Sequence, residues 1–385
     1  MTRTVERETM DQHKHILLVG GGGPTGALVV NALIAEGHRV AVMNTGRHPV
    51  TFDGPVEHLA ADPNFLESVQ QAVAGRYFDT AIVQYGRLRL VARALTGHVE
   101  HLVGITSTFY PGWIDPPATV RPTSETGEAR DWSVQYLDEG LPMPPHVPLD
   151  PVGKFGARVV ETDTALQWAH AQGDLATTIL RYPRIYGPRQ PGAVEWSIVR
   201  RLLDGRARII VPEGGFLLQS ALYAENAARI VLAVVRDRRA SAGRVFNCAD
   251  GEPISHRKWI RLIADAMGRT VELVSAPAAL ARPAWPYARW PLTVGHHVLD
   301  IGDLAALGYT PAPVAYGIRR TVDWFLEDPA ARGGAAEPQL KDAFRYDMED
   351  RIIAELDRAR AAIEAIDFPD FDMSHYYAHP SRPAR

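Results

Sequence analysis

Short apolar runs alternate with amphipathic stretches along the first half of the chain. The runs HILLVG, from His15, and HRVAVMN, from His38, enclose GALVVNALIAEG, in which apolar residues recur at helical spacing. Three more apolar runs follow, FDTAIVQ, HLVGIT and ATTILRY, separated by the helical patterns LRLVARALTG and GARVVETDTALQWAHAQG. Strands that alternate with helices form parallel sheets covered on both faces, and the strands of such sheets are apolar throughout. The pattern therefore predicts an α/β protein with a doubly wound parallel sheet over residues 14–183.

A proline-rich stretch interrupts this domain between residues 111 and 154. It holds nine prolines and no clear periodicity. Loops of this length inside a compact domain are more often functional than plain connectors. We expect a lid or a substrate wall here, and the alternative is a disordered decoration.

Two further parts follow the sheet domain. WSIVRRLLDG, RARIIVPEGG and ENAARIVLAVVRD predict a helix, a strand and a helix, and so a smaller α/β substrate domain over residues 184–334 with elements that return to the first domain. Residues 335–385 are predicted to form a C-terminal helix and tail. An apolar stripe on that helix predicts docking on another surface, and it consists of Ile352, Leu356, Ala359, Ile363 and Ile366.

Composition narrows the classes of function. The 385 residues include 41 Lys and Arg against 45 Asp and Glu, and no basic, aromatic-interleaved stripe predicts a nucleic-acid partner. The single cysteine, Cys248, excludes an internal disulfide and a thiolate zinc site, and we interpret His375 and His379 as isolated surface histidines, so no metal is expected. No segment approaches the roughly 20 apolar residues of a membrane span, and the polar opening lacks the apolar core of a secretory signal. We expect a soluble, cytoplasmic protein that does not bind membranes.

The segment GGGGPTG, residues 20–26, joins the first predicted strand to the first predicted helix. Three of its glycines stand in the G-x-G-x-x-G register of dinucleotide-binding Rossmann folds. The first glycine permits a tight turn, the second lets the backbone approach a diphosphate, and the third allows the helix to pack closely. The free amides at the helix N-terminus then hold the phosphates. The residues predicted to bind the cofactor here are Gly20, Gly21, Gly23, Pro24, Thr25 and Gly26.

The end of the second predicted strand distinguishes the two nicotinamide dinucleotides. An acid there accepts hydrogen bonds from the ribose hydroxyls of NAD, but Asn44 occupies the position and Arg47 follows it. Because a cation so placed can neutralise the 2′-phosphate of NADP, we expect NADP as the cofactor, with NAD as the alternative. Asp62, at the predicted end of the third strand, is placed to accept from the adenine amino group. A turn-capping role for Asp62 is the competing interpretation.

Over residues 14 to about 330 the chain resembles the extended short-chain dehydrogenase/reductase family, also called the epimerase/dehydratase family, in an atypical form. The resemblance rests on GGGGPTG, MNTGR, GITSTFYPG, LRYPRIYGPR, VFNCADGEPIS and HHVLDIGDLAALGYTP, which follow one another in the family's order. It implies a nicotinamide cofactor, contacts of Tyr182 and Pro183 with that cofactor, and a homodimer.

The family's chemistry uses a tyrosine four residues before a lysine, because the lysine ammonium lowers the pKa of the phenol that exchanges the proton. Two registers are open in this sequence. Aligning FGARVVETD with the family's helix places Phe155 at the tyrosine and Val159 at the lysine. Anchoring on Lys154 instead places Asp150 at the tyrosine. The first register, which the spacing to Arg181 favours, implies that the usual general acid is missing.

Other residues are candidates for polarising or protonating a substrate. The resemblance places Thr106, Ser107 and Thr108 where the family's hydrogen-bonding serine or threonine projects, with Tyr110 close behind. Lys154 lies beside the vacated tyrosine position. The predicted catalytic residues are therefore Thr106, Ser107, Tyr110 and Lys154, with an ordinary polar role as the alternative for each.

Further polar residues lie near the predicted mouth of the site, beyond the carboxyl ends of the strands. In the proline-rich stretch these are Tyr136, His146 and Asp150. Arg189 could hold an anionic group, but we interpret Arg189 and Glu195 as solvated loop charges.

These observations predict an NADP-dependent oxidoreductase or epimerase-like enzyme that acts on a small carbonyl or alcohol. Two alternatives stay open. One is a dinucleotide-binding sensor or scaffold without redox turnover, favoured by Phe155 and Val159. The other is an isomerase, dehydratase or lyase that uses a bound cofactor and returns the hydride.

Overall fold

The computed structural model describes residues 13–47, 50–84, 86–108, 134–137, 154–288 and 296–369. The chain divides into two compact units, residues 1–342 and residues 343–385. Within the described ranges, every helix is too short or too polar to cross a lipid bilayer.

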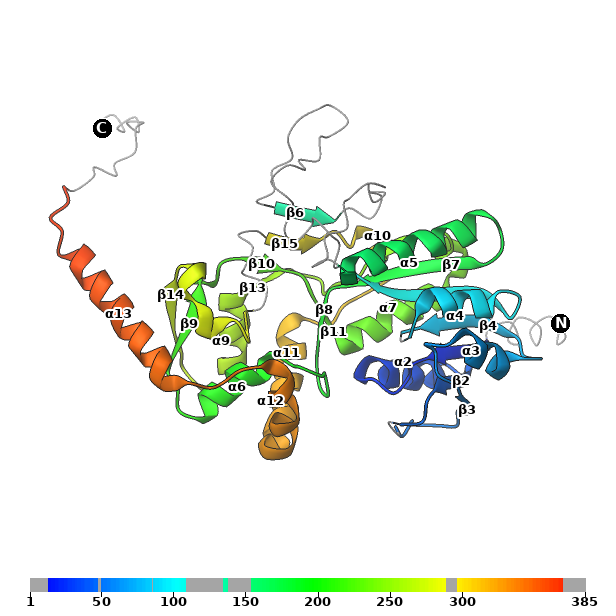
Figure 1. Ribbon diagram of the computed structural model, residues 1–385, viewed down its shortest axis with the longest axis horizontal. Coiled ribbons are helices and arrows are strands. Elements are labelled where there is room, and N and C mark those ends of the chain that lie inside the picture. The colour runs from blue at the N-terminus through cyan, green and yellow to red at the C-terminus, as the bar shows by residue number, and fades with distance from the viewer. Residues whose placement is uncertain are drawn as a thin grey trace, which may run out of the picture. The chain divides into compact units, whose positions relative to one another are not determined.

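A seven-stranded sheet forms one part of the first unit, drawn on the right in Figure 1. All its strand pairs are parallel. From edge to edge the strands are β12 (Val245–Asn247), β7 (Ala176–Tyr182), β5 (Val99–Ser107), β4 (Phe78–Val83), β1 (His15–Val19), β2 (Arg39–Asn44) and β3 (Glu57–Ala60). The order reverses at β1, which has β2 on one side and β4 on the other. Ligands of open α/β sheets bind at such a switch point, beyond the carboxyl ends of the strands.

Helices cover both faces of this sheet. One face packs against α2 (Pro24–Ala35) and α7 (Ala224–Arg236), and the other against α3 (Leu66–Val73), α4 (Leu88–Leu95) and α5 (Lys154–Ala171). Successive residues of β1 enter the two cores in turn, since Ile16 and Leu18 belong to the first and Leu17 and Val19 to the second. Burial on both faces explains why these strands are apolar throughout. The predicted doubly wound α/β fold is confirmed.

The remaining strands form three small sheets. The four-stranded sheet has the order β13 (Ile254–Ser255), β10 (Leu218–Gln219), β15 (His296–Leu299) and β6 (Val134–Leu137), while β8 (Arg184–Tyr186) pairs with β11 (Ala221–Tyr223) and β9 (Arg208–Pro212) with β14 (Glu272–Ala276). The other described helices of this unit are α6 (Glu195–Leu203), α8 (Arg238–Ser241), α9 (His256–Ala266), α10 (Gly302–Ala306), α11 (Val314–Glu327) and α12 (Gly334–Leu340). Strand β12 shows that the chain re-enters the large sheet after residue 184. The domain boundaries at residues 183 and 334 stay predictions.

The proline-rich stretch is not a loop throughout. Residues Val134–Leu137 form β6, which pairs in parallel with β15. This strand falls between residues 123 and 141, which include no proline. Because proline lacks the N–H that a strand ladder uses, such a window favours a strand, and VQYL offers β-branched and aromatic residues for it. The prediction of a continuous loop is therefore wrong at β6, and the rest of residues 111–153 lies outside the described ranges.

The second unit contains α13 (Tyr346–Glu364), which confirms the predicted C-terminal helix. Its predicted docking stripe is not buried as a whole, because Ile363 is 67% exposed and Ile366 is 61% exposed. Ile353, one position beyond Ile352, is the buried isoleucine. Docking of the distal part of the stripe on another surface stays a prediction.

Candidate functional site

The glycine-rich turn between β1 and α2 is shaped by close backbone contacts. Gly20 and Gly21 have φ of 115° and 47°, values that favour glycine. The Gly20 N–H donates to the Met43 carbonyl at 3.0 Å, which ties the turn to β2. A Cβ on Gly26 would lie 2.7 Å from the Gly21 Cα, so only glycine lets α2 approach the turn this closely.

Helix α2 begins directly at this turn. Gly23 is its N-cap residue and Pro24 its first residue, and no side chain caps the helix. The N–H groups of a first helical turn have no partner within the helix. They and the helix dipole form a site for an anion such as a diphosphate.

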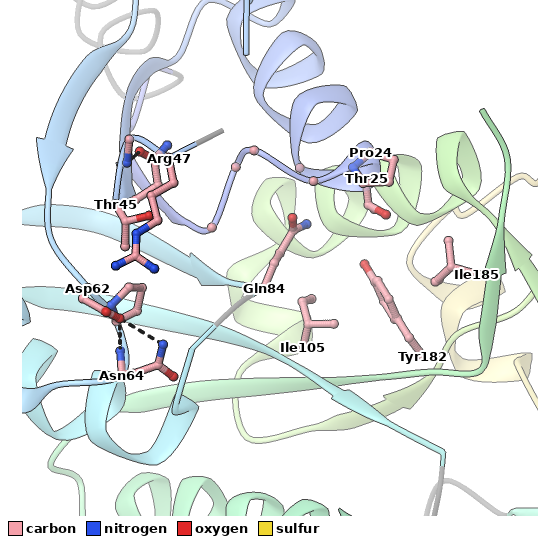
Figure 2. Close-up of a pocket in the computed structure, with 18 residues that line it drawn as sticks. Pro24, Thr25, Thr45, Arg47, Asp62, Asn64, Gln84, Ile105, Tyr182 and Ile185 are labelled. Atoms are coloured by element: carbon pink, nitrogen blue, oxygen red, sulfur yellow. Dashed lines mark hydrogen bonds between the residues drawn. The ribbon is translucent and has the colours of Figure 1, made fainter. Parts of the chain in front are cut away.

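A cavity of about 550 Å³ opens beside the turn. It is lined by Gly20, Gly21, Gly22, Gly23, Pro24, Thr25, Gly26, Asn44, Thr45, Gly46, Arg47, Asp62, Pro63, Asn64, Gln84, Ile105, Tyr182 and Ile185. Every residue predicted from the sequence to bind the cofactor is among them except Pro183. Figure 2 shows Arg47 and Asp62 at one end of the cavity, Tyr182 and Ile185 at the other, and Gln84 between them.

The end of the cavity that holds Arg47 and Asp62, here called the first end, is formed by polar side chains that also order the local backbone. The Asn44 Oδ1 accepts a hydrogen bond from the Gly46 N–H at 2.9 Å, so Asn44 holds the loop that carries Arg47. The Asp62 Oδ1 accepts from the Asn64 backbone N–H at 3.0 Å and from its Nδ2 at 2.9 Å. These two bonds, with a smaller contribution from the nearby charge of Arg47, hold the pKa of Asp62 below its usual value. Asp62 therefore caps a turn with one oxygen while it also lines the cavity.

The opposite end is apolar and aromatic. Ile105 lies near the carboxyl end of β5, Tyr182 is the last residue of β7, and Ile185 lies in β8. The Tyr182 hydroxyl donates to the Ala227 carbonyl at 3.5 Å, and burial raises the pKa of this phenol well above its usual value. The hydroxyl of Tyr182 is therefore directed at α7, while Tyr182 also lines the cavity.

Of the four residues predicted to be catalytic, Thr106 and Ser107 lie one and two positions after the cavity-lining Ile105, but they are not among the lining residues. Thr106 and Ser107 end β5, in register with Arg181 and Tyr182 of β7. The Thr106 Oγ1 is buried and has no hydrogen-bond partner within the described residues. Lys154 is the first residue of α5. Tyr110 lies outside the described residues.

Phe155 and Val159, which the favoured register aligns with the family's tyrosine and lysine, fall in the first turns of α5. Phe155 follows Lys154 directly, and Val159 is buried. The alternative tyrosine position, Asp150, and the nearby His146 lie outside the described residues. Tyr136 belongs to β6.

Arg189 and Glu195 differ in their exposure to solvent. Arg189 is exposed, with a left-handed φ of 65°. Glu195 is 1% exposed, and its Oε1 accepts from Arg184 Nη1 at 2.6 Å. The interpretation of Glu195 as a solvated loop charge is wrong, because residue 195 opens α6 and packs against β8 through this ion pair.

Sequence reasoning missed several lining residues, of which Gln84 and Ile185 are the most informative. Gln84 directly follows β4, and its backbone N–H donates to the Val19 carbonyl at 3.0 Å. Its position at a strand end beside the switch point is the signal that could have found it.

Comparison with known proteins finds one family model that is similar to part of this chain. The model of the NAD dependent epimerase/dehydratase family matches residues 139–249. Over these residues the chain is similar to this family, and the resemblance drawn from the sequence is thereby confirmed. This similarity supports an NAD(P)-dependent enzyme of the epimerase/dehydratase type.

Individual relatives of the family differ in their reactions. The chain is 27% identical over 313 residues to a 3-diazoavenalumate denitrifying reductase from a Streptomyces species, an alignment that covers 77% of this chain and 95% of that protein. It is 24% identical over 329 residues to a dTDP-glucose 4,6-dehydratase from Streptomyces griseus, covering 81% of this chain and 94% of the dehydratase. The crystal structure of the UDP-glucose 4-epimerase of Thermus thermophilus in complex with NAD matches with a TM-score of 0.58 and 22% identity, over 82% of this chain and 99% of the epimerase. At that identity the epimerase shows the shared fold alone.

Proposed function

We propose that this protein is an NADP(H)-dependent reductase that transfers hydride to a small organic electrophile. The observation that carries the cofactor assignment is the first end of the cavity, where β2 ends in Asn44 and Arg47 lines the wall. An acid at the end of β2 would repel a 2′-phosphate, whereas a guanidinium pairs with it.

The residues present fit a dinucleotide. The contact between Gly26 and Gly21 brings the uncapped start of α2 to the turn, where a diphosphate can accept from backbone amides. Asp62 and Asn64 lie beside Arg47, at the end that would hold the adenosine part. Ile105, Tyr182 and Ile185 form the wall available to the nicotinamide. When bound there, NADPH supplies the hydride.

The class of substrate depends on whether a side chain of the site can donate a proton. Reduction of a carbonyl requires a proton as well as a hydride, and the favoured register places Phe155 and Val159 where the family has its tyrosine and lysine. Tyr182 holds its own proton against Ala227. Among the side chains described at this end of the cavity, none is arranged as a general acid.

An aryl diazo compound would need no such acid. Replacement of dinitrogen by hydride forms a carbon–hydrogen bond and breaks the carbon–nitrogen bond, and dinitrogen leaves with that bonding pair. In the balanced reaction, an arenediazonium ion and NADPH give the arene, dinitrogen and NADP⁺. The name of the Streptomyces relative describes a reductase that removes nitrogen from a diazo compound, which supports this class over a carbonyl or alcohol.

Titration of the protein with NADPH and NADH by nucleotide fluorescence tests the cofactor assignment. We expect tighter binding of NADPH, and Arg47→Ala should weaken it by about 10–100-fold, the range for hydrogen bonds to charged groups, with little effect on NADH. Arg39→Ala is the matched control, because Arg39 lies at the opposite end of β2 and pairs with Glu57. Preference for NADH would contradict the assignment to NADP, and binding of neither nucleotide would contradict the proposed function.

Turnover with C4-deuterated NADPH tests the substrate class. Arenediazonium salts should yield deuterated arene and dinitrogen faster than without enzyme, while ketones and aldehydes of similar size react slowly. Rapid carbonyl reduction would contradict the diazo proposal. The proton donor would then be sought among the predicted catalytic residues Thr106, Ser107, Tyr110 and Lys154. Tight NADPH binding with no turnover of either class would favour the sensor or scaffold alternative.

A further inference from the structure

We propose that the side-chain amide of Gln84 donates a hydrogen bond to the diphosphate of the bound dinucleotide. This inference rests on the proposed function, because it places the nucleotide in the cavity beside the glycine turn. It assigns a binding role to a residue outside the glycine motif and outside the ends of β2 and β3.

The backbone fixes Gln84 at the switch point of the sheet. Its N–H donates to the Val19 carbonyl at 3.0 Å, across the boundary between β4 and β1. Val19 is the last residue of β1, and Gly20 begins the turn. Gln84 is therefore held directly beside the backbone that would contact the phosphates.

The side chain has a donor that the protein does not satisfy. The Gln84 Nε2 is buried, and no hydrogen-bond partner exists for it among the described residues. Gln84 also lines the cavity. Figure 2 shows its amide end directed toward the glycine turn and the start of α2. A buried donor without a partner destabilises the protein on its own, and a ligand oxygen at this place would remove that cost.

The surroundings favour the diphosphate over the other parts of the nucleotide. Arg47 and Asp62 lie at the first end of the cavity, and Tyr182 lies at the opposite end, with Gln84 between them. The middle of the cavity is also where the backbone of the turn and the first turn of α2 form an anion site. A neutral amide donor there adds to those backbone donors without repelling the phosphate charges.

Three variants test the inference by nucleotide binding and thermal melting: Gln84→Leu, Gln84→Glu and Gln172→Leu. Gln84→Leu should weaken NADPH binding by about tenfold, as expected for one hydrogen bond to a charged group, and Gln84→Glu should weaken it further because a carboxylate repels the diphosphate. Gln172→Leu is the control, since Gln172 is exposed just after α5 and away from the cavity. Its affinity for NADPH should equal that of the wild type.

Adenosine 2′-phosphate, which has no diphosphate, is the second ligand. Its affinity should be the same in all four proteins. The melting temperature of ligand-free Gln84→Leu should not fall, because the substitution removes an unsatisfied donor, whereas the rise on adding NADPH should shrink. A merely structural role for Gln84 would lower the ligand-free melting temperature instead.

The inference is overturned if Gln84→Leu binds NADPH as tightly as the wild type. It is equally overturned if the variant loses affinity for adenosine 2′-phosphate to the same extent as for NADPH. Failure of the wild type to bind any nicotinamide nucleotide has a different meaning, because it would contradict the proposed function itself.

Discussion

At the scale of single residues, substitutions at two glycines of the turn should affect different properties. Gly26 should matter for the stability of the fold, and Gly23 for nucleotide binding alone. A Cβ on Gly26 would meet the Gly21 backbone, whereas a Cβ on Gly23 would meet nothing within 4 Å. Gly26→Ala should lower the free energy of unfolding by about 1–3 kcal/mol, the usual range for overpacking, and should abolish NADPH binding. Gly23→Ala should leave unfolding nearly unchanged but weaken NADPH, because its Cβ enters the cavity.

Urea unfolding and nucleotide titration of both variants measure these effects. Equal loss of stability in the two would mean that α2 does not approach the turn as closely as the Gly26 contact indicates. Full nucleotide affinity in Gly23→Ala would mean that the ligand does not contact this part of the turn.

At the scale of elements, one buried ion pair anchors α5 on β7. The Asp163 Oδ2 accepts from Arg181 Nε at 3.0 Å, and both side chains are almost fully buried. Removing one partner of such a pair leaves the other charge in a low-dielectric interior. Asp163→Ala should therefore lower the free energy of unfolding by about 3–5 kcal/mol.

The exposed pair between Arg89 and Glu161 provides the control on the same helix. Glu161→Ala should cost no more than about 1 kcal/mol, as is usual for surface pairs. Denaturant unfolding of both variants compares them directly, and similar losses would contradict the role given to Asp163. Phe155 and Val159, which the favoured register aligns with the family's tyrosine and lysine, belong to the same helix.

The strands and helices of the large sheet could be predicted because their signals are local. Apolar runs predicted β1, β2, β4, β5 and β7, and helical spacing predicted α2, α4 and α5, whereas α3 was not predicted. Strand β6 gave no such signal, because its four residues are too few to show a period and its partner β15 is distant in the sequence.

The residues of the candidate site also divide into those with a local signal in the sequence and those without one. Arg47 and Asp62 were predicted because each lies shortly after the end of a strand, Arg47 after β2 and Asp62 after β3. Gln84 was missed because its importance depends on the pairing of β4 with β1 and on the direction of one side chain. Glu195 was misjudged because its burial depends on Arg184, an ion pair that no local pattern reports.

At the scale of the whole molecule, two buried histidines predict a loss of stability in acid. Burial, together with Arg238, Lys14 and His170, lowers the pKa of His101 to about 3. Burial and Arg184 lower that of His256 to about 4. Each folded pKa lies below the ordinary value of 6.5, so the unfolded chain binds more protons in this range and stability falls as the pH drops below about 6.5.

Each histidine should cost about 1–2 kcal/mol at pH 5 relative to pH 7. The His101 Nε2 lies 2.8 Å from the Thr178 Oγ1, which itself donates to the Ser241 carbonyl, so His101 donates here in its neutral form. His101→Gln retains a donor but cannot titrate. Urea unfolding at both pH values should show a smaller acid loss in this variant, and an unchanged loss would contradict the assignment to His101.

The division of the chain at residue 342 predicts that the second unit is dispensable for the cofactor. All cavity-lining residues lie between Gly20 and Ile185, and Asp342, which pairs with the buried Arg201, stays in the first unit. A chain that ends at residue 342 should keep the NADPH affinity of the full chain. Sedimentation of both chains also tests the proposed homodimer, because loss of dimerisation on truncation would assign the contact to the second unit.

The strand order of the sheet has a consequence for biosynthesis. The glycine turn, the adenosine end of the cavity and Gln84 are all encoded before β5, whereas Tyr182, Ile185 and the edge strand β12 are translated much later. The nascent chain therefore contains the residues of one end of the cavity before Tyr182 and Ile185, at the opposite end, have been translated. Parallel strands joined by long crossovers are slow to assemble, and the edge of β5 cannot pair with β7 until residues 176–182 have been translated.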